Sequence, residues 1–89
     1  MTIAVRYFAR LRETFGITFE AVRLPAAGMT AITLALLLGE LRARHGERAD
    51  ALLSPRIRIA IDGEIVPFDA DMLLRSGCEV AFLPPVTGG

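Results

Sequence analysis

The sequence predicts a single α+β domain, in which one main helix packs across a five-stranded sheet and short extra helices join some of the strands. Three observations support this fold class. Leucines recur at helical spacing in one stretch, several other stretches alternate apolar and polar residues as strands do, and 53% of the 89 residues are hydrophobic. A chain of this length forms one domain, which we assign to residues 1–83, with an extended tail at residues 84–89.

The first strand is expected over residues 2–8. Ile3, Val5 and Tyr7 share one face of this strand, and we assign that face to the core because its side chains are larger and more apolar. Phe8 then falls on the outer face. A large aromatic side chain in that position is a candidate contact residue for a partner rather than a core residue.

A short helix and a second strand are expected next. Residues 9–15 have the composition of one or two helical turns, and Gly16 ends them. Alternation continues over residues 17–24, which predicts a strand antiparallel to the first. A loop is then expected over residues 25–33.

The main helix is expected to begin after Thr33, acting as its N-cap, and to continue to about His45. Gly46 follows as the residue that ends the helix, and we interpret His45 as a helix-terminal residue. Gly39 within the helix costs about 1 kcal/mol relative to alanine, which indicates close packing against another element. Four leucines have the spacing of one buried stripe: Leu34, Leu37, Leu38 and Leu41.

The second half of the domain is expected to begin with a short extra helix. Residues 47–53 are assigned to it, with Leu52 and Leu53 both filling the base of the core. A strand over residues 56–62 follows. Asp62-Gly63 is a strong signal for a two-residue hairpin turn at the end of that strand.

A short return strand is expected over residues 64–66, and Pro67 ends it. Alternation requires either Ile65 or Val66 to face outward, and we assign Ile65 to the outer face. Residues 69–75 are expected to form turns or a short helix before the last strand.

The last strand, residues 78–83, leads directly into a tail that ends with two glycines. Prolines cannot donate ladder hydrogen bonds and fix φ near the polyproline value, so the tail is expected to leave the domain in an extended direction. Glycines have no side chain, which would let a terminal carboxylate enter a narrow channel. The alternative is a frayed terminus. The tail residues are Pro84, Pro85, Val86, Thr87, Gly88 and Gly89.

Composition argues against several classes of function. The net charge is zero, so we expect binding neither to nucleic acid nor to an anionic membrane. The only cysteine, Cys78, alternates with core residues, and no metal-ligand spacing is present, so we expect a packing role, no metal and a cytoplasmic location. We find no signal peptide, no apolar stretch near the ~20 residues of a membrane span, and no motif of an autonomous active site.

The sequence EVAFLPPVTGG at residues 79–89 resembles the C-terminus of the small, sulfur-carrying subunit of molybdopterin synthase, the MoaD family. Residues 7–13, 41–46 and 61–64 also fit this family, so the similarity covers nearly the whole chain. The resemblance implies a ubiquitin-like β-grasp fold. In that fold the first and last strands pair in parallel at the centre of a mixed sheet.

The resemblance also implies a reaction. The carboxylate of Gly89 would be adenylated by a partner, converted to a thiocarboxylate, and used to donate sulfur to precursor Z in the large subunit, forming molybdopterin. The chain would thus be the sulfur-donating subunit of a sulfurtransferase. Its partners would be the large subunit, in a heterotetramer of two small and two large chains, an E1-like adenylating enzyme and a sulfur donor protein. ATP, Mg²⁺ and precursor Z would be bound by partners, and this chain would bind no cofactor.

Several residues are expected to contact these partners. Phe8, Ile65 and Leu83 would form an apolar outer patch around the root of the tail, with Arg12 supporting it electrostatically. Residues 84–87 would lie in the partner's channel, ahead of Gly88 and Gly89. The alternatives are a sulfur carrier for thiamine or another pathway, a ubiquitin-like protein modifier, and an interaction module in which the tail is incidental.

Overall fold

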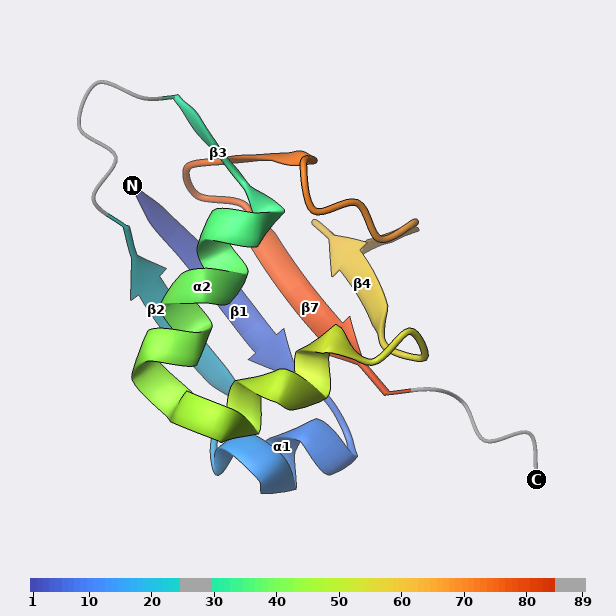
Figure 1. The fold of residues 1–89 in the computed structure, drawn as a ribbon. Helices are drawn as coiled ribbons and strands as arrows, with labels where there is room; N and C mark the ends of the chain where they lie inside the picture. Colours follow the sequence, from blue (N-terminus) through green and yellow to red (C-terminus); the bar gives the residue numbers. More distant parts are fainter. Residues whose placement is uncertain (25–29, 85–89) are drawn as a thin grey trace.

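The computed structural model describes residues 1–24 and 30–84 of the chain. Seven strands and three helices occur in these ranges (Figure 1). In chain order they are β1 (Thr2–Tyr7), α1 (Arg10–Phe15), β2 (Phe19–Arg23), β3 (Ala31–Thr33), α2 (Leu34–His45), the 3₁₀ helix η1 (Gly46–Leu53), β4 (Arg58–Ile61), β5 (Glu64–Val66), β6 (Leu73–Arg75) and β7 (Glu79–Leu83).

Five strands form one mixed sheet in the order β2-β1-β7-β4-β5. The first and last strands, β1 and β7, pair in parallel at its centre, with Val5 opposite Val80, and every other pair in this sheet is antiparallel. The helix α2 lies across one face of the sheet (Figure 1). This arrangement confirms the expected β-grasp topology.

The core lies between this face of the sheet and α2. Ile3, Val5 and Tyr7 of β1 are all buried, as their alternation predicts. Opposite them, α2 buries three of the four leucines of its predicted stripe, and Leu38 is partly buried against the same cluster. The Tyr7 ring stacks on Phe15 of α1 with 4.2 Å between ring centroids, so α1 closes one end of the core.

The ends of α2 are set by the residues that the sequence indicates. The Leu36 N–H donates to Thr33 Oγ1 at 3.2 Å, so Thr33 is the N-cap. Gly46 has φ +65°, and its N–H donates to the Arg42 carbonyl, which ends the helix. In the described part of the chain, no helix is long and apolar enough to cross a membrane.

Gly39 does not pack closely against another element, contrary to the prediction. A Cβ added there would meet nothing within 4 Å, and the residue is exposed in the middle of α2. We therefore expect Gly39→Ala to raise the free energy of unfolding by about 0.5–1 kcal/mol, measured by urea denaturation, because alanine loses less backbone entropy. Gly46→Ala is the control and should destabilise the fold, since φ there is +65°. A change of the same sign in the free energy of unfolding for both variants would contradict this explanation.

Two segments predicted as a loop and as turns or a short helix instead contribute short strands. Residues 31–33 form β3 and residues 73–75 form β6, which pair as a separate two-stranded antiparallel sheet. Ile32 and Leu74 lie opposite each other and are both buried. Three-residue strands are too short to give a recognisable alternation, which explains why the sequence pattern missed them.

The prediction for Leu53 is also wrong. Leu52 is buried at 1% exposure, whereas Leu53 is 60% exposed. The 3₁₀ geometry of η1 turns the chain by about a third of a circle per residue, so two adjacent leucines cannot both face the core. The alternation of residues 56–62 predicts that Ile57, Ile59 and Ile61 face the core. Ile59 in β4 is buried, whereas Ile57, just before β4, and Ile61, its last residue, are only partly buried.

Candidate functional site

The candidate site begins where β7 ends. Leu83 is the last residue of β7, and both Leu83 and Pro84 are partly buried. Leu83 lies opposite Arg58 at the start of β4. The remaining predicted tail residues lie outside the described part of the chain, and their roles stay predictions. They are Pro85, Val86, Thr87, Gly88 and Gly89.

The sheet has an outer face, on the side opposite α2. Because successive side chains of a strand alternate, the residues next to the buried Ile59 and Phe82 face outward. One row of outward side chains crosses all five strands in register. In order from β2 to β5, it consists of Phe19, Arg6, Ala81, Ala60 and Ile65.

Two alanines form the floor of this outer face. Ala60 and Ala81 are only 6% and 8% exposed, although they point away from the main core. Arg6 on one side and Ile65 on the other carry longer side chains in the same row. We call this feature the alanine furrow, defined by Ala60 and Ala81. Because both alanines are nearly inaccessible, the accessible apolar surface of this face comes from the longer side chains beside them.

Of the predicted contact residues, Ile65 borders the furrow, and Phe8 and Leu83 lie at the end of the sheet where β7 finishes. Ile65 faces outward with 64% exposure, which confirms the assigned register of β5. Phe8 is 43% exposed, and its N–H donates to the Phe82 carbonyl at 3.2 Å, so its backbone lies beside the end of β7 next to Leu83. The structure therefore brings exposed apolar side chains to the outer face and to the tail root.

The fourth predicted contact residue, Arg12, is exposed but lies in α1 rather than on a strand. Its carbonyl accepts the N–H of Gly16, which ends that helix. Arg12 therefore borders the sheet at the end where β1 finishes and does not form part of the outer-face row.

Sequence reasoning missed Arg6 and Phe19 as members of this surface. Arg6 Nε donates to Glu79 Oε1 at 2.5 Å, and its guanidinium lies 5.3 Å from the centroid of the Phe19 ring. These contacts hold Arg6 over the sheet beside the furrow. The signal that could have revealed this face is the repeated use of alanine at outward strand positions, which are Ala4, Ala21, Ala60 and Ala81.

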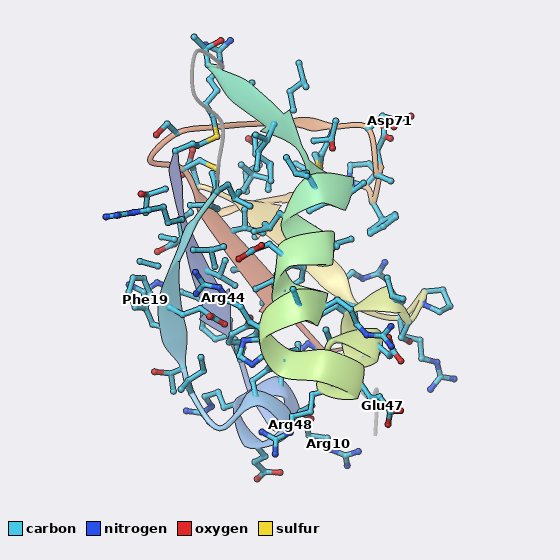
Figure 2. The ribbon with its side chains drawn as sticks, turned by 60° about the vertical axis from the view of Figure 1, so that its left-hand side comes forward. Arg10, Phe19, Arg44, Glu47, Arg48 and Asp71 are labelled. Atoms are coloured by element: carbon cyan, nitrogen blue, oxygen red, sulfur yellow. The ribbon has the colours of Figure 1, made fainter. Side chains whose placement is uncertain are left out.

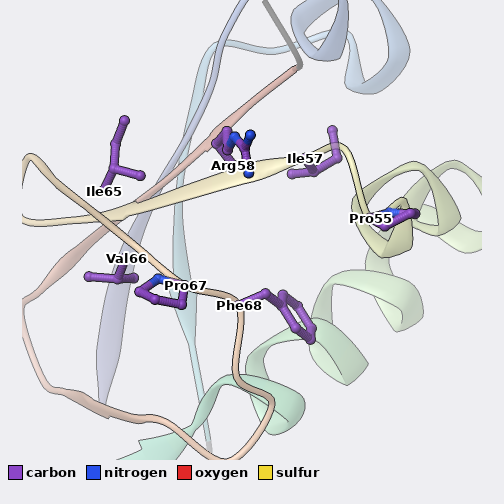
Figure 3. Close-up of a pocket in the computed structure, with 7 residues that line it drawn as sticks. All are labelled: Pro55, Ile57, Arg58, Ile65, Val66, Pro67 and Phe68. Carbon is purple, nitrogen blue, oxygen red and sulfur yellow. The ribbon is translucent and has the colours of Figure 1, made fainter.

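A groove of about 540 Å³ adjoins the outer face near β5 (Figure 3). It shares Ile65 and Arg58 with that face, and Phe68 borders it from the segment after β5. The lining residues are Pro55, Ile57, Arg58, Ile65, Val66, Pro67 and Phe68. Arg58 is the only charged residue among these lining residues.

Cys78 has the packing role that the sequence predicts. Its side chain is buried, and its N–H donates to the Arg75 carbonyl at 3.1 Å. Burial, and secondly the nearby charge of Asp62, raise the pKa of the thiol above its usual value. The thiolate is the nucleophilic form, so this cysteine is poorly suited to handling sulfur. Residues 1–24 and 30–84 also contain no cluster of three or more metal-ligating side chains.

A hydrogen-bonded cluster joins β1, β2 and the end of α2 on the core side of the sheet. Glu20 Oε2 accepts from Tyr7 Oη at 2.7 Å and lies 2.7 Å from His45 Nε2, while Arg44 Nη1 donates to Glu20 Oε1 at 3.2 Å. Arg44 extends from α2 toward β2 (Figure 2). Burial disfavours the carboxylate, but the hydrogen bonds from Tyr7 and His45 outweigh it and leave the pKa of Glu20 lowered.

This cluster is structural, and its pH dependence can be tested. The folded-state pKa of Glu20 is lowered, so its charge stabilises the fold above the unfolded value of 4.5, and this contribution is lost as pH falls through the folded pKa. We expect Glu20→Gln to cost about 1–3 kcal/mol at neutral pH, with a smaller cost in acid, measured by urea unfolding at several pH values. Glu47→Gln, on an exposed residue, is the control. A cost for Glu20→Gln that does not change with pH would contradict this role.

Comparison with known proteins shows the family and the fold of the chain. A model described as the ThiS family matches residues 5–89. A molybdopterin synthase sulfur carrier subunit from Escherichia coli K12 is 37% identical over 87 residues, covering 98% of this chain and 99% of that protein. A protein of the same name from Haemophilus influenzae is 34% identical over 86 residues, covering 96% of each chain. The crystal structure of SAMP1 from Haloferax volcanii is 25% identical, covers 100% of both chains and has a TM-score of 0.75.

Proposed function

The chain belongs to the ThiS family, and from this premise we propose that it is the sulfur-carrier subunit of a molybdopterin synthase. The observation that carries the proposal is the name shared by its curated relatives, molybdopterin synthase sulfur carrier subunit, in proteins that align with nearly the whole chain.

The first chemical step activates the carboxylate of Gly89. A carboxylate is a poor electrophile, because displacement at its carbon would require an oxide leaving group. An E1-like partner would bind ATP and Mg²⁺, and the Gly89 carboxylate oxygen would attack the α-phosphorus and release pyrophosphate. The product is an acyl adenylate, whose AMP is a good leaving group.

The second step replaces oxygen by sulfur. The terminal sulfur of a persulfide on a donor protein attacks the acyl carbon, and AMP leaves with the bonding electron pair. This forms an acyl disulfide, and a thiol then attacks the donor's sulfur, so that a disulfide forms on the donor and the Gly89 thiocarboxylate is released. Free sulfide would give the same thiocarboxylate in one displacement. The anionic sulfur is a strong nucleophile and would be delivered to precursor Z in the large subunit.

The folded domain would present the tail to each partner in turn. The outer face formed by Phe8, Ile65 and Leu83 supplies apolar contact area next to the point where the chain leaves β7. Residues 84–87 would fill the partner's channel and Gly88 its narrowest part. We propose that the working enzyme is a heterotetramer of two small and two large subunits, from which the carrier dissociates to be recharged.

Reconstitution tests the function directly. The chain, loaded with sulfur by an adenylating enzyme, ATP and sulfide, is mixed with a purified large subunit and precursor Z, and molybdopterin is measured by fluorescence of its oxidised product. We expect pterin formation that depends on the loaded chain. A chain that accepts sulfur but supports no pterin formation with its large subunit would point to a carrier for another pathway.

A protein modifier is the second candidate, because a Gly-Gly tail on a β-grasp domain also suits amide bond formation with lysine. The chain itself contains no lysine, so it cannot be its own target. Mass spectrometry of cell extracts distinguishes the two functions. A carrier gains sulfur in place of oxygen at Gly89, whereas a modifier appears as covalent adducts on lysines of other proteins.

A further inference from the structure

Charged side chains without an ion pair are distributed unevenly along the strand direction. All ten arginines and all ten aspartate and glutamate side chains lie in the described residues. Within those residues, the ion pairs that involve arginine are Arg6–Glu79, Arg42–Asp50, Arg44–Glu20 and Arg44–Glu40. The seven other arginines and six other carboxylates form no ion pair with a described residue, so their charges are free to act on a partner.

Most of these arginines lie at the end of the sheet where β7 finishes. We call this the tail end; it comprises α1, η1 and residues 54–58, because β1 and β7 run toward it and β4 starts from it (Figure 1). Five of the unpaired arginines and two of the unpaired glutamates belong to this end. The set consists of Arg10, Arg12, Arg48, Arg56 and Arg58, with Glu13 and Glu47.

The opposite end of the sheet has the reverse charge. We call it the far end; it comprises the β4–β5 hairpin, the segment from residue 69 to residue 77 and the end of β2. The Asp62 N–H donates to the Glu79 carbonyl at 2.8 Å, which places the hairpin beside the start of β7. Two of the unpaired arginines and four of the unpaired carboxylate side chains belong to this end. The set consists of Arg23 and Arg75, with Asp62, Glu64, Asp69 and Asp71.

The arginines of the tail end lie around the root of the tail. Arg58 is directly opposite Leu83, and Arg56 precedes it by two residues. On another side, α1 and η1 are in contact, and Arg10 and Arg48 lie together at this end of the molecule (Figure 2). All five side chains are exposed. Guanidinium groups keep their charge at any physiological pH, so this end is permanently positive.

We propose that the tail end is an electrostatic docking collar for a partner protein whose tail-binding channel has carboxylates around its entrance. The inference rests on the proposed function, because only a protein that inserts its C-terminal tail needs this end to arrive first. With zero net charge, the chain is not drawn as a whole to a polyanion, and its separated charges mainly orient it. An acidic entrance would attract the tail end and repel the far end.

The collar should act on the rate of association. Charges at the rim of an interface mainly change the association rate constant and its salt dependence, while the dissociation rate depends on the buried contacts. Screening over a Debye length of about 8 Å at physiological ionic strength weakens such steering, and high salt removes it. Nucleic acid and anionic membranes are other polyanions that a basic surface can bind, and the test below includes them.

Two double variants with the same change in net charge provide the test. Arg48→Gln with Arg56→Gln removes two charges from the collar and avoids Arg58, which borders the groove. Arg23→Gln with Arg75→Gln removes two charges from the far end and serves as the matched control. Association with the purified large subunit and with the adenylating enzyme is followed by stopped-flow fluorescence over a series of NaCl concentrations. Circular dichroism melts verify that both variants fold.

We expect the collar variant to associate about three- to tenfold more slowly than wild type at low salt with at least one of the two partners, and the control variant to associate no more slowly. The difference should disappear at high salt, and dissociation rates should be unchanged. Equal effects of the two variants, faster association of the collar variant, or no association of wild type with either partner overturns the proposal. Tight wild-type binding to a DNA duplex or to phosphatidylserine vesicles, lost in the collar variant, also overturns it.

The outcome is separable from the proposed function. Sulfur loading of Gly89 with sulfide is measured by intact mass in the same preparations at high salt, where steering is absent. Loading without any difference between the variants in association rate rejects the collar and leaves the carrier function standing. A wild-type chain that binds partners with the expected salt dependence but never gains sulfur rejects the carrier function instead.

Discussion

Deletion of Gly88 and Gly89 is expected to abolish sulfur loading and molybdopterin formation without changing the stability of the domain. The two glycines would provide the reactive carboxylate. They have no side chains, so they would also let the carboxylate enter the partner's active site. A chain that ended at Thr87 would place its carboxylate two residues, roughly 6 Å, short of that position. A displacement of even 1 Å can cost about 100-fold in rate, so no turnover above background is expected.

The measurement compares the truncated chain with wild type in the reconstituted assay and in urea denaturation. The core consists of residues up to Phe82, so the unfolding transition should be the same in both chains. Thr87→Ser, which keeps the length of the tail, is the control and should retain activity. Pterin formation by the truncated chain would show that the sulfur is carried elsewhere, and a lowered unfolding midpoint would show that the two glycines support the fold.

Phe8→Ala is expected to weaken binding of the large subunit by about 10- to 100-fold, because aromatic anchors at interface centres typically contribute this much. Phe8 lies beside the tail root with 43% of its surface exposed, so the substitution removes contact area while leaving the core intact. Isothermal titration calorimetry with the purified large subunit gives the dissociation constant. Ile65→Ala should act in the same direction, since Ile65 borders the alanine furrow from β5.

Leu73→Ala is the matched control for this interface. Leu73 is 69% exposed, so its side chain is about as accessible as that of Ile65, but it belongs to β6 in the separate two-stranded sheet at the far end. We expect its substitution to leave the dissociation constant within about twofold of wild type, the effect of a residue outside the contact. Equal losses for Leu73→Ala and Phe8→Ala would mean that the outer face is not the docking surface.

The sheet and the main helix were predictable because their signals are local and long. Six residues of alternation in β1 and four leucines at helical spacing in α2 decide which face is buried. The helix ends were predictable because Thr33 and Gly46 satisfy terminal backbone groups by known geometries. The parallel pairing of β1 with β7 was expected only from the family resemblance, since alternation does not determine which strands become neighbours.

Features that depend on register between distant segments were not predictable. The alanine furrow requires residues 60 and 81 to lie opposite each other, and the cluster around Glu20 joins Tyr7 and His45 from three elements. The cluster around Glu20 has no local pattern, and the outward alanines become a signal only when the pairing of the strands is known. The wrong prediction for Leu53 has a different cause, since adjacent residues of either kind of helix point about 100–120° apart, and composition does not show which of the two leucines faces the core.

The central claim is that the carboxylate of Gly89 is the group that carries sulfur, and that the folded domain serves to present it. The most direct measurement is the intact mass of the chain after incubation with its adenylating enzyme, ATP, Mg²⁺ and sulfide, followed by fragmentation to locate the change. We predict exchange of one oxygen for one sulfur at residue 89. An unchanged mass, under conditions in which the enzyme consumes ATP in the presence of the chain, would contradict the claim.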